Sequence, residues 1–430
     1  MKLRAHRLAV PLALLMAGVA APALAGHEDL PPEEYVIRAL DAHPSVQAAA
    51  ARLDAAKAQA AMLRVGTHEA TIQGSFVRRS VQTEGDYNEF DTTILRPFRL
   101  PGKARLDKQA GNFGVDAAHN RMEDVRHQTS LSLASLWYDW LTASEQQRTD
   151  RASVDNLDRA LAAVRRREQL KDAAALDSDQ AASALALAKG QLADSVARAS
   201  VARATLAATF PDLPLPVDPP ALAMPHGLDT DFMALRALVV ERSHEIGAAR
   251  ADADKQATLA RRARADRIAD PSVGVRLFSE RSGMEKGAGV VASIPLGGRY
   301  RARAADEAQA MAGSARMELG AVEREVAAMA DADLSNARTR LAAWQELAEA
   351  VKRAEAVTQR SDRGYKLGAT DLSDLLYAQR QAQDARRAEI NARSEALRAI
   401  LKLEIDAHVI WMPPEEAAEH GAPGVTHPQD

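Results

Sequence analysis

Residues 365–379 read YKLGATDLSDLLYAQ, with a Gly-Ala-Thr break at residues 368–370 between two long stretches of helix-forming residues. Glycine tolerates the left-handed backbone at a helix end, and threonine can cap the helix that follows. Asp371 and Asp374 then fall at the start of that next helix, where carboxylates favour the positive end of the helix dipole. This stretch therefore predicts the tip of a helical hairpin.

Two very long helices are predicted on either side of such tips. From about Lys103 to Leu170, and again from about Tyr300 to Lys366, the sequence has no proline and little glycine. Each run predicts a helix of roughly 65 to 70 residues, or about 100 Å at 1.5 Å per residue. Rods of this length need lateral support, and apolar residues recur along the second run in mostly three- and four-residue steps, as in coiled coils.

The same order of segments occurs twice in the chain. Alanine-rich helical stretches at Glu34–Arg64 and Val240–Arg264 each lead into a β-like passage, a glycine turn and a long helix. Prolines between residues 211 and 220 forbid a regular helix between the halves. The expected organisation is a first repeat over residues 26–210, a proline-rich linker over 211–228, a second repeat over 229–411 and a disordered tail over 412–430.

The duplication also predicts a second hairpin tip. A Lys-Asp-Ala-Ala run with a following Ser-Asp pair echoes the Lys-Leu-Gly-Ala run and Ser-Asp pair of the first tip. This alignment pairs Ala173 with Gly368, and Asp179 with Asp374. We therefore expect the reversal of the first half around Ala173.

Four short passages, two in each half, alternate like β-strands, beginning near Thr71 and Pro271 in the two halves. Each is about 9 to 11 residues long, the length with which a tilted strand crosses a bilayer. Aromatic residues are only 4% of the chain, yet they gather in these passages, as they do at membrane interfaces. The expected lipid-facing residues are Ile72, Phe76, Phe90, Ile94, Val273, Val275, Val290 and Ile294.

The alternative for these passages is a soluble sheet packed on a helix. If they do span a membrane, four strands cannot close a barrel by themselves, because the smallest known barrels have about eight. The membrane interpretation therefore requires several copies of the chain.

The N-terminus has the pattern of a cleaved signal peptide. Lys2, Arg4 and Arg7 precede an apolar run over residues 8–19, and small residues favour cleavage after Ala25. Residues 1–25 would then be removed as the protein leaves the cytoplasm. The alternative is an uncleaved anchor, but the run is short of the roughly 18 to 20 apolar residues of a membrane span.

Composition excludes several classes of function. The formal charge of -4 gives no electrostatic footprint for nucleic acid. The absence of cysteine removes disulfides, thiolate metal sites, cysteine nucleophiles and lipid-accepting cysteines. We expect no cofactor.

Signal peptide, duplicated halves, paired strands, long helices and the tip at 365–376 together resemble the TolC family of outer-membrane efflux channels over nearly the whole mature chain. The resemblance implies a mainly α fold with a membrane β-barrel, in which a homotrimer supplies twelve strands and duplicated helical hairpins form a periplasmic tunnel. It also implies a passive exit duct in the outer membrane that works with a periplasmic adaptor and an inner-membrane pump, of the resistance-nodulation-division type. The chain itself would not be an enzyme.

The resemblance also gives roles to the tip residues. Asp374 matches one position of the family's paired aspartate ring, while Tyr377 occupies the other, and Thr370 replaces an arginine that ties the tip shut in the best-known pattern. Capping carboxylates remain an equal alternative for Asp371 and Asp374. The implied gate is Asp374, Asp371, Tyr377 and Thr370, and the implied adaptor-contact tip is Tyr365, Gly368, Ala173 and Asp179.

Metal export is one branch of this family. The turn over residues 98–103 looks like that of its heavy-metal (cobalt-zinc-cadmium type) members, which favours divalent cations as cargo. A metal site in the chain itself is not predicted, because His119 and His127 are about 12 Å apart along a helix. His420 and His427 fall in the expected disordered tail, where solvated side chains are favoured over a metal site.

Two rival functions share parts of this sequence pattern. A periplasmic coiled-coil adaptor or structural protein without a pore would also have a signal peptide and hairpins, but one β region around a single hairpin. An exported hydrolase would need a nucleophile or metal cluster, and the sequence offers neither.

Overall fold

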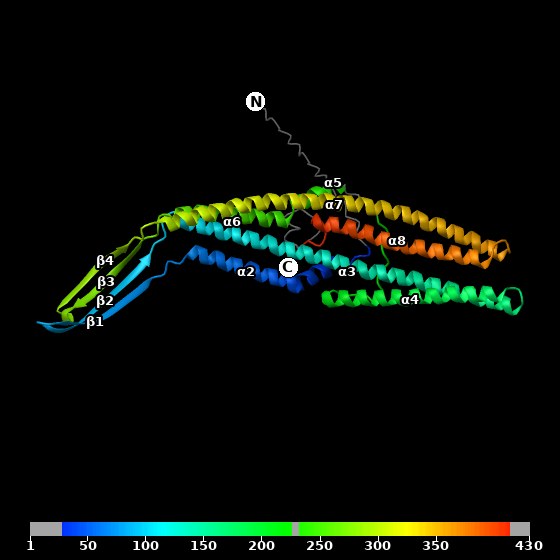
Figure 1. Cartoon of the computed structure of the whole chain (residues 1–430), viewed down its shortest axis with the longest axis horizontal. Coiled ribbons are helices and arrows are strands. Elements are labelled where there is room, and N and C mark those ends of the chain that lie inside the picture. The colour runs from blue at the N-terminus through cyan, green and yellow to red at the C-terminus, as the bar shows by residue number, and fades with distance from the viewer. Residues whose placement is uncertain (1–27, 226–231, 413–430) are drawn as a thin grey trace, which may run out of the picture.

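The computed structural model describes residues 28–225 and 232–412 of the chain. The molecule is long and narrow, with a sheet at one end and two helical hairpin tips at the other (Figure 1). The expected signal peptide lies outside the described residues, as does all but the first residue of the expected tail. That residue, Met412, is buried.

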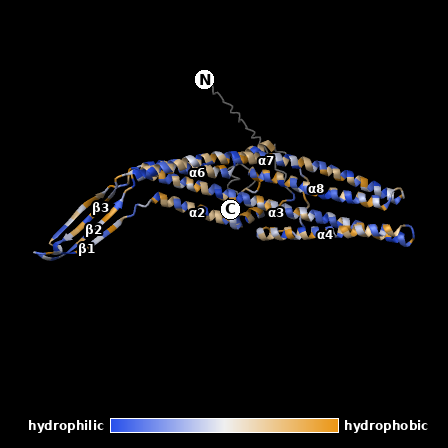
Figure 2. Cartoon of the chain, viewed as in Figure 1, coloured by the Kyte–Doolittle hydropathy of each residue, from blue (hydrophilic) through white to orange (hydrophobic). Residues whose placement is uncertain are grey.

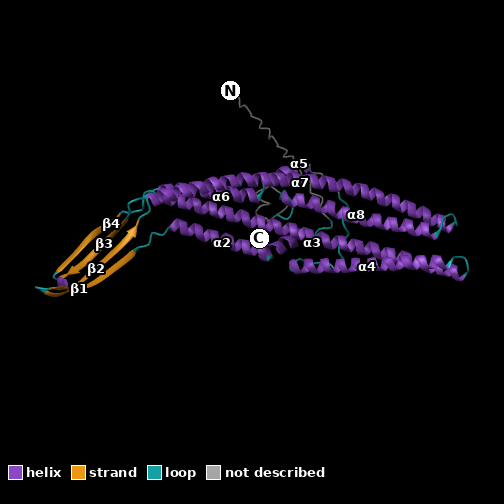
Figure 3. Ribbon diagram, in the orientation of Figure 1, coloured by secondary structure: helices purple, strands orange, loops and turns teal. Residues whose placement is uncertain are grey.

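The order of elements is the same in both halves, as Figure 3 shows by type of structure. The first half contains α1 (Glu33–Ala42), α2 (Pro44–Val65), β1 (Thr71–Val81), β2 (Gly85–Pro97), α3 (Lys103–Gln169) and α4 (Ala175–Thr209). The second half contains α5 (Phe232–Glu241), α6 (His244–Ala265), β3 (Ser272–Glu280), the short turn η1 (Arg281–Gly283), β4 (Glu285–Ser293), α7 (Arg299–Lys366) and α8 (Leu372–Asp406). This arrangement confirms the predicted duplication of helical hairpins with two strands in each half.

The two long helices have nearly the predicted extent. α3 has 67 residues and α7 has 68, so each is about 100 Å long. α2 and α4 both pack on α3, and α6 and α8 both pack on α7. Two shorter helices therefore lie along one long helix in each half (Figure 1).

The helix before the strands is broken in both halves, which differs from the expected unbroken stretches. In the first half Pro44 begins α2, and the residue before a proline is driven out of the helical region, so His43 is extended with ψ 133°. In the second half the break falls at Ser243, whose Oγ accepts a hydrogen bond from Ile246 N at 3.2 Å and caps α6.

The largest apolar cluster lies midway along the rods. Trp137 and Trp140 of α3 are both 2% exposed, and their rings meet edge to face with centroids 5.4 Å apart. The Trp137 indole N–H donates to the backbone oxygen of Asp29 at 2.8 Å. Elsewhere along the rods hydrophobic and hydrophilic residues are interspersed (Figure 2). The cluster also includes Leu213 and Leu222 from the linker and Leu397, Leu401 and Ile405 from α8.

The four strands form one antiparallel sheet in the order β1-β2-β3-β4. β1 and β4 each pair on one side only, so the sheet has two open edges. Within residues 28–225 and 232–412, no helix is long and apolar enough to cross a membrane.

A buried lysine joins the sheet to the rods. Lys103, the first residue of α3, is 2% exposed, and its Nζ lies 2.9 Å from Asp266 and 2.8 Å from Asp270. The same ammonium donates to the Ile268 backbone oxygen at 2.7 Å. Asp270 also accepts from Leu100 N at 2.9 Å. The chain between β2 and α3 is thereby held to the chain between α6 and β3.

This junction predicts a loss of stability in acid. Burial alone would raise the pKa of the Asp270 carboxyl, but hydrogen bonds from Lys103, Leu100 N and His68 outweigh burial and lower the pKa to about 2. The carboxylate therefore stabilises the fold above its ordinary pKa of 3.8, and this contribution is lost as the pH falls toward 2. Between pH 5 and 2, we expect the wild type to lose about 2 kcal/mol more than Asp270→Asn, measured as the free energy of unfolding. Parallel pH profiles of the two proteins would contradict this account.

Candidate functional site

The register of the sheet gathers apolar side chains on one face. Ile72 lies opposite Ile94, which lies opposite Val275, which in turn lies opposite Val290. Because alternate residues of a strand share a face, this row continues in both directions. Seven of the eight expected lipid-facing residues lie on this face, each at least 42% exposed: Ile72, Phe76, Phe90, Ile94, Val273, Val275 and Val290.

The eighth residue, Ile294, lies just outside the sheet. β4 ends at Ser293, which pairs with Ser272, the first residue of β3. The next pairing would involve Pro271, which has no backbone N–H to donate to the ladder. Pro295 also follows Ile294 directly. The expected membrane strand is therefore one residue shorter at this end.

The opposite face of the sheet carries ion pairs between neighbouring strands. Arg79 of β1 pairs with Glu89 of β2 at 2.7 Å, and Arg276 of β3 pairs with Asp91 of β2. The guanidinium of Arg276 also lies over the ring of Phe278, 5.4 Å from its centroid. The sheet thus has one largely apolar, exposed face and an opposite face whose acidic partners Glu89 and Asp91 are half-buried.

The two hairpin tips share one backbone motif. After α7, Gly368 has φ +73°, and Ala369 N donates to Gly364 O at 2.8 Å. After α3, Lys171 has φ +64°, and Asp172 N donates to Arg167 O at 2.8 Å. Both ends are Schellman motifs, with Lys171 in the left-handed position that glycine usually fills.

This geometry corrects the expected correspondence between the tips. Lys171, not Ala173, occupies the place of Gly368, and both next helices begin four residues later. Asp177, not Asp179, therefore matches Asp374, and its carboxylate accepts from Ala174 N at 3.4 Å. The alignment of the two tip sequences was two residues out of register, because similar side chains do not show which residue has the left-handed backbone conformation. Ala173 and Asp179 still lie at the tip.

The cap of α8 also differs from the expectation. Asp371 is the N-cap, and its Oδ1 accepts from Asp374 N at 2.9 Å. The Thr370 hydroxyl instead donates back to Ser361 O of α7 at 3.3 Å. Threonine therefore closes the turn, while aspartate caps the helix. Asp374 is exposed in the first turn of α8.

One hydrogen bond between the two tips was not predicted from the sequence. Arg167 Nη1 donates to the Tyr365 hydroxyl at 2.9 Å, and the Arg167 guanidinium lies 5.3 Å from the centroid of that ring. Ser373 Oγ donates to Gln180 at 3.2 Å in a second link. Tyr377, by contrast, is 64% exposed. No local sequence pattern predicts contacts between residues so far apart in the chain. The only local signal is that Arg167 is one of the basic residues in the last turn of α3.

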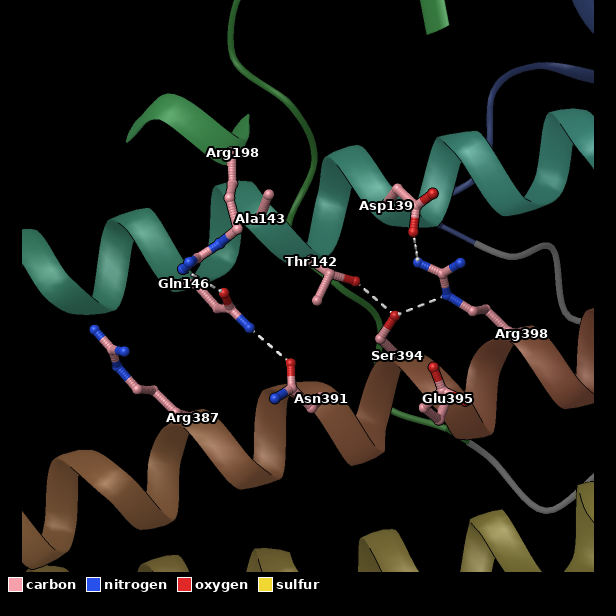
Figure 4. Close-up of a pocket in the computed structure, with 10 residues that line it drawn as sticks. All are labelled: Asp139, Thr142, Ala143, Gln146, Arg198, Arg387, Asn391, Ser394, Glu395 and Arg398. Atoms are coloured by element: carbon pink, nitrogen blue, oxygen red, sulfur yellow. Dashed lines mark hydrogen bonds and ion pairs between the residues drawn. The ribbon is translucent and has the colours of Figure 1, made fainter. Parts of the chain in front are cut away.

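A polar cleft between α3, α4 and α8 lies nearer the middle of the rods (Figure 4). Gln146 Nε2 donates to Asn391 at 2.6 Å, and Arg398 Nη2 donates to Asp139 at 2.6 Å. Arg387, at the edge of the cleft, pairs with the buried Asp150 at 2.7 Å. Because these arginines already have carboxylate partners, the cleft bridges the two hairpins and offers little uncompensated charge.

The two histidines considered for metal binding lie in different surroundings. His119 is exposed, whereas His127 Nε2 lies 2.9 Å from the buried Asp406 carboxylate. The His127 ring stacks on that of His408 with centroids 5.2 Å apart. In the part of the chain that the structure describes, no group of three His, Cys, Asp or Glu side chains could hold a metal ion.

No protein-family model matches the chain, and no curated protein compared with it gives a match. Solved structures do match. The outer membrane protein VceC from Vibrio cholerae has a TM-score of 0.69 and 19% identity, over 87% of this chain and 95% of that chain. A membrane protein from Pseudomonas aeruginosa has a TM-score of 0.71 and 17% identity, over 92% and 99%. The open state of the MtrE outer membrane channel from Neisseria gonorrhoeae has a TM-score of 0.68 and 17% identity, over 87% and 88%. This chain therefore shares their fold along almost its whole length.

The tip geometry predicts that Asp371 stabilises the start of α8. Asp371→Ala removes the N-cap of α8 and should destabilise the tip by about 1 kcal/mol. The amides in the first turn of α8 should therefore exchange about fivefold faster. Asp371→Ser is the matched control, because serine caps nearly as well. Hydrogen exchange of the purified protein provides the measurement. Equal exchange in Asp371→Ala and the wild type would show that the cap contributes nothing.

Proposed function

We propose that the protein is the outer-membrane channel of a tripartite efflux system, of the TolC type. Three copies would join their sheets edge to edge into a twelve-stranded barrel, and their helices would continue it as a tunnel through the periplasm. The observation that carries this proposal is the apolar row of Ile72, Ile94, Val275 and Val290 on a sheet with two open edges. Apolar surface and unpaired edges are both stable when copies close a barrel in lipid.

The fold of the neighbours supports this proposal. The structures of VceC and MtrE are described as an outer membrane protein and an outer membrane channel. A signal peptide cleaved after Ala25 would deliver the chain to the periplasm and then to the outer membrane. A pore-free adaptor or structural rod leaves the exposed apolar face of the sheet without a role.

The hairpin tips would be the periplasmic entrance. The adaptor would meet the tip around Tyr365, Gly368, Ala173 and Asp179, and an inner-membrane pump of the resistance-nodulation-division type would supply energy. The channel itself would be a passive duct without catalytic residues. Divalent metal cations are the proposed cargo, on the likeness of the turn at 98–103 to the heavy-metal branch.

The gate would combine a contact between the two tips with a carboxylate near the pore axis. The bond from Arg167 to Tyr365 holds the two hairpins of one chain together at the tip. Asp374 and Tyr377 project from the first turns of α8 without being buried. If three copies of Asp374 converge on the pore axis, their like charges repel one another and attract cations.

The membrane placement predicts a face-dependent effect of charge. Ile94→Arg should destabilise the assembled protein by about 2 to 4 kcal/mol if residue 94 lies near the bilayer midplane, and by much less if it lies near the interface. Thr93→Arg is the matched control, because Thr93 lies on the opposite face of the same strand. Melting of the purified assembly and its yield from outer membranes would be compared. Equal losses for both variants, or none for Ile94→Arg, would argue against a membrane strand.

Conductance tests the channel and its gate together. Purified protein in planar bilayers should form pores that divalent or trivalent cations block from the periplasmic side. Asp374→Ala should assemble normally and weaken this block, while Asp371→Ser, which keeps the helix cap, should have a smaller effect. Equal block in the wild type and Asp374→Ala would refute the gate, and failure of the wild type to conduct would refute the channel.

A further inference from the structure

The helix ends next to the sheet carry an unusual excess of positive charge. The segments 60–70, 95–108, 259–272 and 294–308 together contain thirteen Lys and Arg residues but six Asp and Glu, although the whole chain has a formal charge of -4. All four segments flank the strands, at the end where α2, α3, α6 and α7 meet the sheet (Figure 1). The basic charge is therefore concentrated at one level of a long molecule.

Part of this charge is already neutralised within the chain. Lys103 is buried between Asp266 and Asp270, and Arg99 and Arg262 both pair with Asp107. Most of the remaining basic residues are exposed. Six of them are exposed and, within the described residues, make neither an ion pair nor a side-chain hydrogen bond, and we call this set the basic collar: Arg64, Arg96, Arg105, Lys108, Arg267 and Arg299.

Exposed apolar side chains are interleaved with the basic collar. Val65, Ile268 and Tyr300 follow collar residues directly in sequence and are 79%, 71% and 85% exposed. Apolar and aromatic side chains beside arginine are the combination found at the boundary between lipid tails and headgroups. A surface that met only water would not need the apolar partners.

The basic collar is also continuous with the apolar face of the sheet. Arg96 lies on β2, two residues after Ile94 and on the same face. It is therefore about 7 Å nearer the helices than Ile94, because a strand rises about 3.3 Å per residue. If Ile94 faces lipid tails, Arg96 lies toward the level of the headgroups.

We propose that the basic collar binds the anionic phosphate headgroups of the membrane leaflet that faces the helices. This inference rests on the proposed function, since it takes the sheet to lie in the membrane. Guanidinium groups suit the partner, because each can donate two parallel hydrogen bonds to a phosphate. The binding would set the depth of the sheet and the tilt of the tunnel against the bilayer.

The test compares lipids that differ only in headgroup charge. Wild-type protein is reconstituted from detergent into vesicles of phosphatidylglycerol or of phosphatidylcholine with the same acyl chains. Flotation of the vesicles shows whether the protein has inserted, and native mass spectrometry counts the lipid that stays bound. The collar variant is Arg96→Gln/Arg105→Gln/Arg267→Gln. The matched control is Arg165→Gln/Arg166→Gln/Arg360→Gln, which removes three exposed arginines near the tips, roughly 90 Å from the collar.

We expect the wild type and the control to retain phosphatidylglycerol in preference to phosphatidylcholine, and the preference to weaken with salt. The collar variant should lose about 100-fold in affinity for the anionic lipid, at about fivefold per basic side chain. All three changed residues are exposed, so the variant should keep its fold, which circular dichroism would verify.

Two results would overturn the basic collar alone. One is an unchanged preference for phosphatidylglycerol in the collar variant. The other is a wild type that floats equally well with both kinds of vesicle and retains both lipids equally. If the collar variant kept its lipid preference but dissociated into monomers, its charges would contact a neighbouring copy. Failure of the wild type to float with either vesicle would overturn the membrane assignment together with the collar.

Discussion

The structure depends on an apolar sheet surface that the described part of the chain leaves exposed. The register places Ile72, Ile94, Val275 and Val290 in one row across four strands, and no helix of the described chain covers them. The same sheet leaves hydrogen-bonding groups unpaired along β1 and β4. Water satisfies the edges but not the face, and lipid satisfies the face but not the edges. The proposed assembly, in which several copies close the sheet within a membrane, would meet both demands.

The rest of the chain extends from this sheet as supported rods. Helices of about 100 Å would not persist alone, so each long helix is paired with two short ones, and aromatic packing around Trp137 fastens them midway. Buried Lys103 fixes the rods to the sheet, and Arg167 with Tyr365 joins the two tips. The polar contacts thus lie at the places where separate segments must keep a fixed geometry.

Much of this fold could be predicted from local chemistry. Proline-free runs gave both long helices, and period-two alternation gave the four strands. The errors have equally local causes. Pro44 breaks a helix that alanine content favoured, and Lys171 adopts a left-handed backbone that only glycine would have signalled. The tie between Arg167 and Tyr365 could not be predicted, because it depends on how two distant hairpins pack.

The most direct test of this account is the state of the protein in its own membrane. Cells producing the full chain would be separated into periplasm, inner membrane and outer membrane, and each fraction analysed by electrophoresis with and without boiling. The account predicts a species of three chains in the outer membrane that boiling converts to single chains. A monomer recovered from the soluble periplasm would contradict it, because the apolar face of the sheet would then be stable in water.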